Sequence, residues 1–291
     1  MSVKLSVIIV SYKNIQVLTD CLGSIRQYND IGDALEVIVS DNSPDNELFD
    51  TVKRSYDWIK IIKNKNDGFG AGNNRGVEIS SGEILLFLNP DTVLVEPIFK
   101  FALDKFEEDS DLALFGVQLI KPDGSNNASF FMYDQYGILA TLKEKYRRKK
   151  GKFIDKNMFI CGADLFVRKE SFDEAGRFDE NIFMYKEEPD LIKRIKLHST
   201  AKKVAFFGNK KIIHLEGGTE SESASKKLTV LDRLLVSDRY YAKKWGLSYN
   251  KIVKSRIKYA RFKKNIYSLL FKKQKSAEQK KIIQFLKSKL D

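Results

Sequence analysis

The sequence predicts an α/β protein with a mostly parallel central sheet flanked by helices and a basic, helical C-terminal tail. Two observations lead to this fold class. Short apolar runs of strand length alternate with helical stretches over the first hundred residues, and positive charge is concentrated near the C-terminus. The chain has 291 residues, of which 43% are hydrophobic and 12% aromatic, so it can bury a large core and is too apolar to be mainly disordered.

Four apolar, β-branched runs of strand length define the first hundred residues. They predict strands at 5–10, 36–40, 58–62 and 84–88. The segments between them predict helices at 15–28, 46–55 and 68–80. Polar clusters directly follow Val10, Ser40 and Leu88. Because ligands of open α/β sheets bind beyond the carboxyl ends of the strands, these clusters predict a ligand site at that edge.

The pattern changes after Asp91. Helices are expected at 97–108, 188–197 and 228–245, and strands at 112–118, 203–207 and 211–214. Another strand, 159–167, is interrupted by the polar stretch Cys161–Asp164. Lys121–Gly124 is a turn signal of a hairpin, and the basic run 143–152 is expected to be a mobile loop. Residues 1–248 therefore form one domain, and 249–291 form the tail.

The formal net charge of +12 comes from the tail. Residues 250–291 hold fourteen Lys or Arg against two acids, which leaves 37 basic and 37 acidic residues for residues 1–249. In the tail, basic residues alternate with aliphatic and aromatic ones, which suits the interface of an anionic membrane. The equally weighted alternative is a helix that packs its apolar face on the body. Nucleic acid is not expected as a partner, because the neutral body offers no broad basic face.

Several classes of protein are excluded by composition. Two cysteines and two histidines cannot build a disulfide framework, a four-thiolate metal site or a zinc finger. No apolar run approaches the roughly 20 residues that span a bilayer. The apolar start is interpreted as a buried strand rather than a signal peptide, so a cytoplasmic location is expected. The glycine-rich stretch 67–74 fails the dinucleotide fingerprint, because Asn73 stands where the third glycine belongs.

Eight short motifs, each modest alone, resemble glycosyltransferase family 2 in their order and spacing. They are Ser6–Tyr12, Val39–Ser43, Asn66–Gly76, Leu88–Asp91, Cys161–Ala163, Phe178–Glu180, Glu187–Leu191 and His214–Gly218. The resemblance is to rhamnosyltransferase-like members that assemble bacterial polysaccharides such as capsule. It implies the Rossmann-like GT-A fold, with a nucleotide-sugar half at about 1–118 and an acceptor half at about 119–248.

The resemblance also implies which residues bind the nucleotide. Asp41 matches the acid that hydrogen-bonds the nucleobase, Ser11 and Tyr12 would line the base, and Asn73 would lie near the nucleotide. Asn89 replaces the more usual first acid of the motif after the fourth strand. Each of these residues also has an ordinary structural interpretation, as a turn residue or as packing at a strand end.

A divalent metal is the implied cofactor. Departure of a nucleoside diphosphate needs cationic stabilisation, which a metal usually supplies. Asp91 matches the family's metal-binding carboxylate and His214 the histidine that completes the site. Carboxylate, imidazole and diphosphate oxygens suit Mn²⁺ or Mg²⁺. A helix-cap acid and a core histidine are the structural alternatives.

An acidic pair at a predicted helix start matches the family's catalytic base. Direct displacement at the anomeric carbon requires a group that accepts the proton of the acceptor hydroxyl. Glu188 is the predicted base and Glu187 its rival, with Pro189 in the first helical turn. Gly162 and Asp190 are candidates for substrate binding, and for Asp190 a role in supporting the site is favoured. The structural alternative is that these acids only stabilise the helix start, because negative charge in a first turn interacts favourably with the helix dipole.

The predicted function is an inverting, metal-dependent transfer of a sugar from a nucleotide-diphosphate donor to a lipid-linked or polysaccharide acceptor. The motifs favour dTDP-rhamnose as donor, and UDP-hexoses remain open. A cytoplasmic enzyme with this tail would work at the inner face of the cell membrane. Remoter alternatives are a nucleotidyltransferase, which lacks its N-terminal basic glycine loop here, a catalytically inactive family member, and a nucleic-acid-binding protein.

Overall fold

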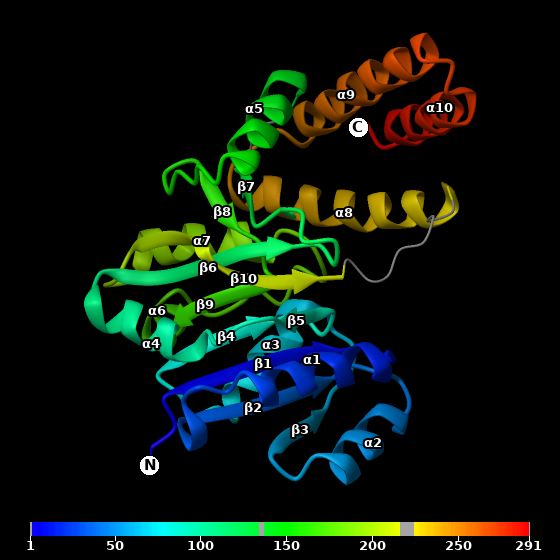
Figure 1. Ribbon diagram of the computed structural model, residues 1–291. Coiled ribbons are helices and arrows are strands. Elements are labelled where there is room, and N and C mark those ends of the chain that lie inside the picture. Colours follow the sequence, from blue (N-terminus) through cyan, green and yellow to red (C-terminus); the bar gives the residue numbers. More distant parts are fainter. Residues whose placement is uncertain (1, 134–136, 216–223, 291) are drawn as a thin grey trace.

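The computed structural model describes residues 2–133, 137–215 and 224–290 (Figure 1). Its strands are β1 (Leu5–Ser11), β2 (Leu35–Asp41), β3 (Ile59–Lys63), β4 (Ile84–Leu88), β5 (Thr92–Leu94), β6 (Leu112–Ile120), β7 (Phe130–Met132), β8 (Met158–Ile160), β9 (Asp164–Arg168) and β10 (Lys203–His214). Its α-helices are α1 (Ile15–Gln27), α2 (Glu47–Ser55), α3 (Phe69–Glu78), α4 (Phe99–Glu108), α5 (Ile138–Lys149), α6 (Lys169–Glu174), α7 (Glu187–His198), α8 (Ala224–Lys244), α9 (Tyr249–Leu269) and α10 (Lys273–Lys287). A short 3-10 turn, Gly32–Ala34, precedes β2.

Eight strands form one sheet in the order β3-β2-β1-β4-β9-β6-β10-β5, and β7 and β8 form a separate antiparallel pair. The neighbours from β3 to β4 run parallel, as do β6 and β10. Strand β9 is antiparallel to both β4 and β6, and β5 is antiparallel to β10. The mostly parallel α/β sheet expected from the sequence is confirmed.

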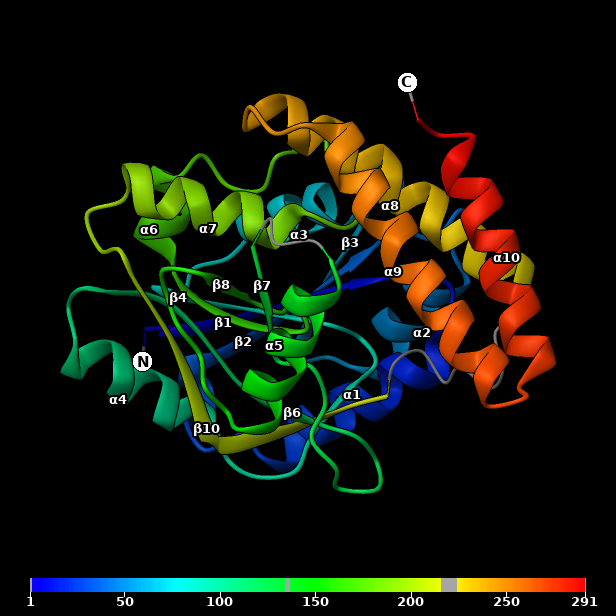
Figure 2. The same ribbon diagram turned by 90° about the horizontal axis from the view of Figure 1, so that it is seen from above.

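Two apolar layers cover the sheet. On one face, α1, α2 and α4 pack on alternate residues of β1, β2, β4 and β6, for example Ile9 and Val39. On the other face, α3, α6, α7 and the β7–β8 pair pack on the intervening residues, such as Ile8 and Phe87. The β-strand period of two explains this division, since neighbouring side chains point to opposite faces. Figure 2 shows the helices around the sheet from above.

The three C-terminal helices share a small apolar cluster. Leu235 of α8, Val253 and Ile257 of α9 and Leu286 of α10 are buried together. In Figure 1, α9 and α10 lie farther from the sheet than α8. Within the described parts of the chain, no helix combines the length and apolarity that crossing a membrane requires.

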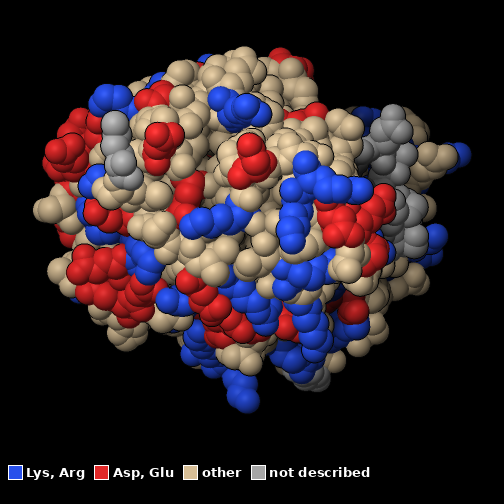
Figure 3. Space-filling view, turned by 90° about the horizontal axis from the view of Figure 1, so that it is seen from below, with Lys and Arg blue, Asp and Glu red and all other residues tan. Residues whose placement is uncertain are grey.

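The charges on the lower face of the molecule are mixed, in agreement with the equal numbers of basic and acidic residues in 1–249. Seen from below, the face around α2 and β3 mixes Lys and Arg with Asp and Glu (Figure 3). Both signs are interspersed there, and no single-sign surface covers this face.

Three expectations about local structure are wrong. The basic run 143–152 is mostly helix α5 rather than a loop, because strong helix formers dominate it and Glu144 and Arg148 pair one turn apart. Segment 159–167 is two strands in different sheets, β8 and β9. The two strands expected at 203–214 are one strand, β10, with an irregularity between Phe207 and Lys211.

Candidate active site

The ends of β1 and β2 form the floor of the candidate nucleotide site. Ser11 lies opposite Asp41 in the parallel register, and the amide of Asn42 donates to the carbonyl of Ser11 over 2.9 Å. The hydroxyl of Ser11 is buried and has no hydrogen-bond partner among the described residues. Tyr12 is 51% exposed, and the Lys13 ammonium lies 5.5 Å from the centre of its ring. A buried, unpaired hydroxyl beside an exposed aromatic ring suits contact with a nucleobase.

Asp41 is fully buried and already holds two donors. Its Oδ1 accepts from the amide of Ser43 and its Oδ2 from the Lys63 ammonium, each over 2.8 Å. Lys63 ends β3 directly opposite Asp41, so the parallel register creates this pair. Sequence reasoning missed Lys63, although a lysine directly after one predicted strand and an acid directly after the preceding one were a usable signal. The two donors leave further lone pairs of the Asp41 carboxylate available.

The glycine-rich segment places α3 against β1. A Cβ at Gly72 would lie 3.0 Å from both Val10 methyl groups, so the helix approaches the strand closely. Asn73 is buried, donates to the carbonyl of Phe69 over 3.0 Å, and its Oδ1 has no partner among the described residues. Its neighbour Asn74 exchanges hydrogen bonds with the backbone of Phe178 at 3.0 and 3.1 Å. Asn74 thus holds the 178–180 segment, a role that the sequence did not indicate.

Asp91 and His214 meet where β5 pairs with β10. His214 Nε2 lies 3.3 Å from Asp91 Oδ1, because His214 is in register with Thr92, the first residue of β5. Both side chains keep partial exposure. Asn89 is held through its backbone, with its amide donating to Ala163 over 3.1 Å and its carbonyl accepting from the Thr92 hydroxyl over 2.7 Å.

The pair fits a divalent metal as two of its ligands. Within the described ranges, no group of three or more His, Cys, Asp or Glu could hold a metal by itself. Two protein ligands leave positions open for diphosphate oxygens, which is the usual arrangement for Mg²⁺ at phosphate sites. The structure brings together the two residues that were predicted as metal ligands.

Glu188 is held by a glycine. The amide of Gly162 donates to Glu188 Oε1 over 2.9 Å, so the glycine predicted to bind substrate positions the predicted base. A Cβ at residue 162 would stand 2.4 Å from that oxygen, so only glycine allows this approach. Loss of hydration raises the pKa of Glu188, and the Gly162 amide opposes this by stabilising the charged form.

Glu187 is the more deeply buried member of the acidic pair. Its pKa lies well above the ordinary range, first because the carboxyl is buried and second because the Glu188 charge is close. Tyr185 and Lys186, which precede the helix, adopt left-handed φ angles of 69° and 83°. This uncommon turn aims both glutamates as α7 begins. Pro189 lies in the first turn, as predicted.

Cys161 lies among the acids. Burial raises the pKa of its thiol, and the charges of Glu188, Asp164 and Asp91 raise it further. The segment that follows Cys161 links the two sites, because the Gly162 amide donates to Glu188 over 2.9 Å and the Ala163 carbonyl accepts from the amide of Asn89 over 3.1 Å. The metal pair and the acidic pair thus flank the same small region at the edge of the sheet.

Asp164 is a second residue that sequence reasoning did not identify. It is fully buried opposite Leu88, and its Oδ2 accepts from the amide of Val117 over 2.7 Å. Its Oδ1 has no partner among the described residues, and burial raises its pKa well above the ordinary range. An aspartate inside an apolar strand is unusual, and that was the available signal.

Asp190 ties α7 to α8 and to the residue that follows α8. It is fully buried, and it accepts from Arg194 Nε over 2.8 Å and from Trp245 Nε1 over 2.9 Å. The Lys244 ammonium adds an ion pair at 2.8 Å. These contacts favour the supporting role over substrate binding. Of the motif His214–Gly218, residues 216–218 lie outside the described residues.

The fold and this site define the class of protein, a glycosyltransferase of the GT-A fold. The pattern of the family described as "Glycosyl transferase family 2" matches residues 6–176, so the chain belongs to that family. The resemblance to glycosyltransferase family 2 stated from the motifs is confirmed.

Two curated relatives match about two thirds of the chain. The low-salt glycan biosynthesis hexosyltransferase Agl10 of Haloferax volcanii is 26% identical over 194 residues, which cover 63% of this chain and 59% of the relative. The GalNAc(5)-diNAcBac-PP-undecaprenol beta-1,3-glucosyltransferase of Campylobacter jejuni is 29% identical over 62% of this chain and 56% of its own length. The chain thus matches less than two thirds of the length of either relative.

Solved structures share the fold at low sequence identity. A mannosyltransferase from Pyrobaculum calidifontis, in complex with GDP-Man and Mn²⁺, superposes with a TM-score of 0.58 at 13% identity, over 84% of this chain and 65% of that one. TarS of S. aureus, in complex with UDP-GlcNAc, gives 0.54 at 16% identity, over 81% and 66%. At these identities the likeness establishes the fold.

Proposed function

We propose that the protein is an inverting, metal-dependent glycosyltransferase that uses a nucleotide-diphosphate sugar. The observation that carries this proposal is that the segment Cys161–Ala163 links two pairs, Asp91 with His214 and Glu187 with Glu188, through the Gly162–Glu188 and Asn89–Ala163 hydrogen bonds. Glu188 accepts the proton of the acceptor hydroxyl as that oxygen attacks the anomeric carbon, and the bond to the diphosphate breaks. Asp91 and His214 would hold a Mn²⁺ or Mg²⁺ ion, which stabilises the departing charge.

The nucleobase of the sugar donor is the finer part of this proposal. A buried carboxylate at Asp41 can only accept hydrogen bonds, and the imide N–H of thymine and uracil is a suitable donor. We keep dTDP-rhamnose as the first donor to test and UDP-hexoses as the second. The solved neighbours bind UDP-GlcNAc and GDP-Man, which supports nucleotide-sugar chemistry without deciding the base.

A donor panel tests the proposal directly. Hydrolysis of dTDP-rhamnose, UDP-glucose, UDP-galactose and GDP-mannose is measured with Mn²⁺ and with excess chelator. We expect one pyrimidine donor to be hydrolysed only with metal, and Asp91→Asn to abolish both its hydrolysis and its binding. Asp104→Asn, which changes an exposed carboxylate of α4, is the matched control and should retain activity. Full turnover in excess chelator would disprove the metal requirement.

We also propose that the acceptor is lipid-linked and that the tail attaches the enzyme to the inner face of the cell membrane. The turn between α9 and α10 carries Leu269, Leu270 and Phe271, which are 78%, 56% and 88% exposed. Lysines flank this turn at positions 263, 264, 272, 273 and 275. Three adjacent exposed apolar side chains surrounded by positive charge suit the interface of an anionic bilayer.

The rest of the tail packs on the protein, so the two interpretations of the tail apply to different residues. Val253 and Ile257 are buried against Leu235 of α8 and Leu286 of α10, whereas Leu269, Leu270 and Phe271 in the α9–α10 turn are exposed. In Figures 1 and 2 the turn lies on the side of the molecule toward which β10 runs. A membrane bound there would face the same side as the candidate site.

Sedimentation of the full chain with anionic vesicles tests the attachment. We expect Leu270→Ser combined with Phe271→Ser to abolish it at physiological salt, with donor hydrolysis unchanged. Leu197→Ser, at an equally exposed leucine of α7, should sediment like the unmodified protein. Undiminished sedimentation of the double variant would refute the proposed turn.

A further inference from the structure

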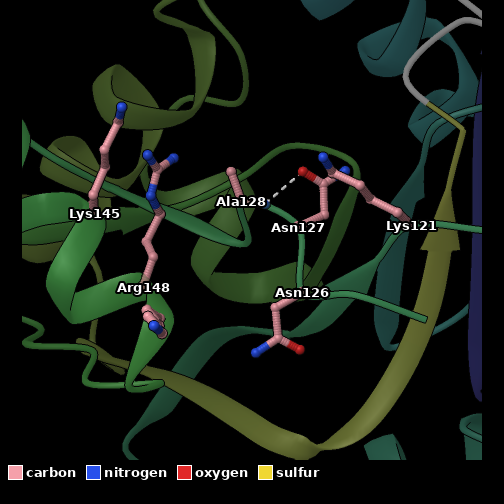
Figure 4. Close-up of a pocket in the computed structure, with 7 residues that line it drawn as sticks. Lys121, Asn126, Asn127, Ala128, Lys145 and Arg148 are labelled. Atoms are coloured by element: carbon pink, nitrogen blue, oxygen red, sulfur yellow. Dashed lines mark hydrogen bonds between the residues drawn. The ribbon is translucent and has the colours of Figure 1, made fainter. Parts of the chain in front are cut away.

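A basic hollow lies between the loop after β6 and helix α5, outside the candidate active site. Its volume is about 580 Å³. Its lining residues are Lys121, Asn126, Asn127, Ala128, Lys145, Arg148 and Lys149. In Figure 4, Lys145 and Arg148 come from α5 on one side, and Lys121 and the two asparagines come from the loop on the other. The side chain of Asn127 accepts from the amide of Ala128, which fixes its orientation.

The charge of this hollow is positive and largely unneutralised. Four of its seven lining residues are Lys or Arg, and none is acidic. Lys121, Lys145 and Lys149 are exposed and form no ion pair with any residue that the structure describes. Arg148 is the exception, because its guanidinium lies 3.4 Å from Glu144 and over the ring of Phe131.

The neighbouring acids are already engaged by the backbone. Glu144 accepts from the amide of Met132 over 2.8 Å, and Asp123 accepts from the amide of Ser125 over 2.9 Å. These contacts hold the two carboxylates in the framework around the hollow. Neither carboxylate forms an ion pair with Lys121, Lys145 or Lys149 within the described residues, so these lysines can bind an anion from solution.

The hollow adjoins the candidate active site through the sheet. Ile120 of β6 is in register with Ile213 of the parallel strand β10. The next residues, Lys121 and His214, therefore lie side by side, with their backbones about 5 Å apart. The segment that supplies Asn126 and Asn127 continues to Ser129, whose carbonyl accepts from the amide of Cys161 over 2.9 Å. The segments that line the hollow are thus connected to β10, which carries His214, and to the Cys161–Gly162 backbone, which bonds Glu188.

We propose that this basic hollow binds a phosphate or diphosphate group of the acceptor. Lysine and arginine bind phosphate oxygens through charge-assisted hydrogen bonds, and asparagine amides add neutral donors. The inference rests on the proposed glycosyltransferase function, in which Asp91 and His214 serve the donor diphosphate and leave this second set of cations for the acceptor. A lipid diphosphate and a phosphodiester polymer both present this chemistry.

Binding to the full chain, with the nucleotide site saturated by UDP and Mn²⁺, tests the proposal. The probes are farnesyl diphosphate below its micelle concentration, a glycerol phosphate oligomer and inorganic pyrophosphate, with farnesol as the uncharged control. We expect Lys145→Glu combined with Lys149→Glu to weaken binding of an anionic probe about tenfold, which corresponds to about 1.4 kcal/mol. The probe that binds most tightly identifies the source of the phosphate.

Two further variants make the result interpretable. Lys53→Glu combined with Arg54→Glu makes the same charge change on α2, at the opposite end of the molecule in Figure 1, and should weaken binding less than twofold because salt screens distant charges. Lys145→Gln combined with Lys149→Gln tests the site without charge reversal and should weaken binding about threefold.

Donor hydrolysis separates this inference from the proposed function. It should be unchanged in all these variants, because none alters the metal pair or the acidic pair. The acceptor site would be overturned if the charge reversals on α2 and α5 weakened probe binding equally, or if neither α5 variant weakened it. Donor hydrolysis would stay intact in either case. Absence of donor hydrolysis in the unmodified protein would instead refute the function on which the inference rests.

Discussion

Replacing Gly162 by alanine should remove catalysis while leaving the fold in place. The added Cβ would lie 2.4 Å from Glu188 Oε1, whereas carbon and oxygen in contact are about 3.3 Å apart. The carboxylate must therefore move by about 1 Å. A misplacement of this size can cost about 10²-fold in rate, or roughly 2.7 kcal/mol of transition-state stabilisation.

The clash falls on Glu188 rather than on the backbone, which makes the prediction specific. The nearest atoms belong to the outer part of one flexible side chain, so the chain can fold with that side chain turned away. We expect Gly162→Ala to lower the donor hydrolysis rate about 100-fold, with nucleotide affinity and the melting temperature nearly unchanged. The measurements are hydrolysis rates, nucleotide titration and thermal unfolding.

Gly23→Ala is the matched control. Gly23 lies in α1, is exposed, and an added Cβ there meets nothing within 4 Å. Its replacement should raise stability by about 1 kcal/mol through helix propensity and leave the rate unchanged. If Gly162→Ala hydrolyses donor within about threefold of the unmodified rate, the contact between Gly162 and Glu188 has no catalytic role, and the assignment of Glu188 as base loses its structural support.

Three further predictions follow from buried polar groups. Burial raises the folded-state pKa of Glu188, so protonation of Glu188 stabilises the fold fully below the unfolded pKa, and this stabilisation is lost as pH rises through the folded pKa. Glu188→Gln, which stays neutral, should therefore raise the melting temperature at pH 8 but not at pH 4, as thermal scans at the two pH values would show. The same variant should abolish turnover. Lys63→Met leaves Asp41 buried without its cation and should cost about 3 kcal/mol in urea unfolding at pH 8, with loss of nucleotide binding. Asn74→Ala leaves the backbone of Phe178 unpaired and should cost about 2 kcal/mol in the same assay.

The sheet edge could be predicted from the sequence because it depends on local signals. Strand-length apolar runs ending in Val10, Ser40 and Leu88 place their polar successors together once the strands are parallel. The partners of these residues were harder to predict. Asp190 binds Lys244 and Trp245, more than fifty residues away, and only the packing of α8 on α7 brings them together.

The basic segments show the same limit. Apolar periodicity identifies helices that pack on a core, and α5 has no buried residue, so its helix was visible only in its composition of good helix formers. In the tail, the alternation of lysines with apolar residues was consistent with packing and with membrane contact. The fold assigns Val253 and Ile257 to packing, and the turn at Phe271 stays exposed.

The start of α7 concentrates features that a helix cap does not explain. Acids in a first turn gain about 0.3–1 kcal/mol from the helix dipole, an interaction that lowers their pKa. Burial instead raises the pKa of both Glu187 and Glu188, so the cost of desolvation exceeds any benefit from the dipole. Two left-handed residues, Tyr185 and Lys186, add roughly 1–3 kcal/mol of backbone strain each. An arrangement kept only for stability would expose these carboxyl groups and relax this turn. The buried acidic pair and the strained turn are instead what the proposed role of Glu188, a base held beside a sugar, requires.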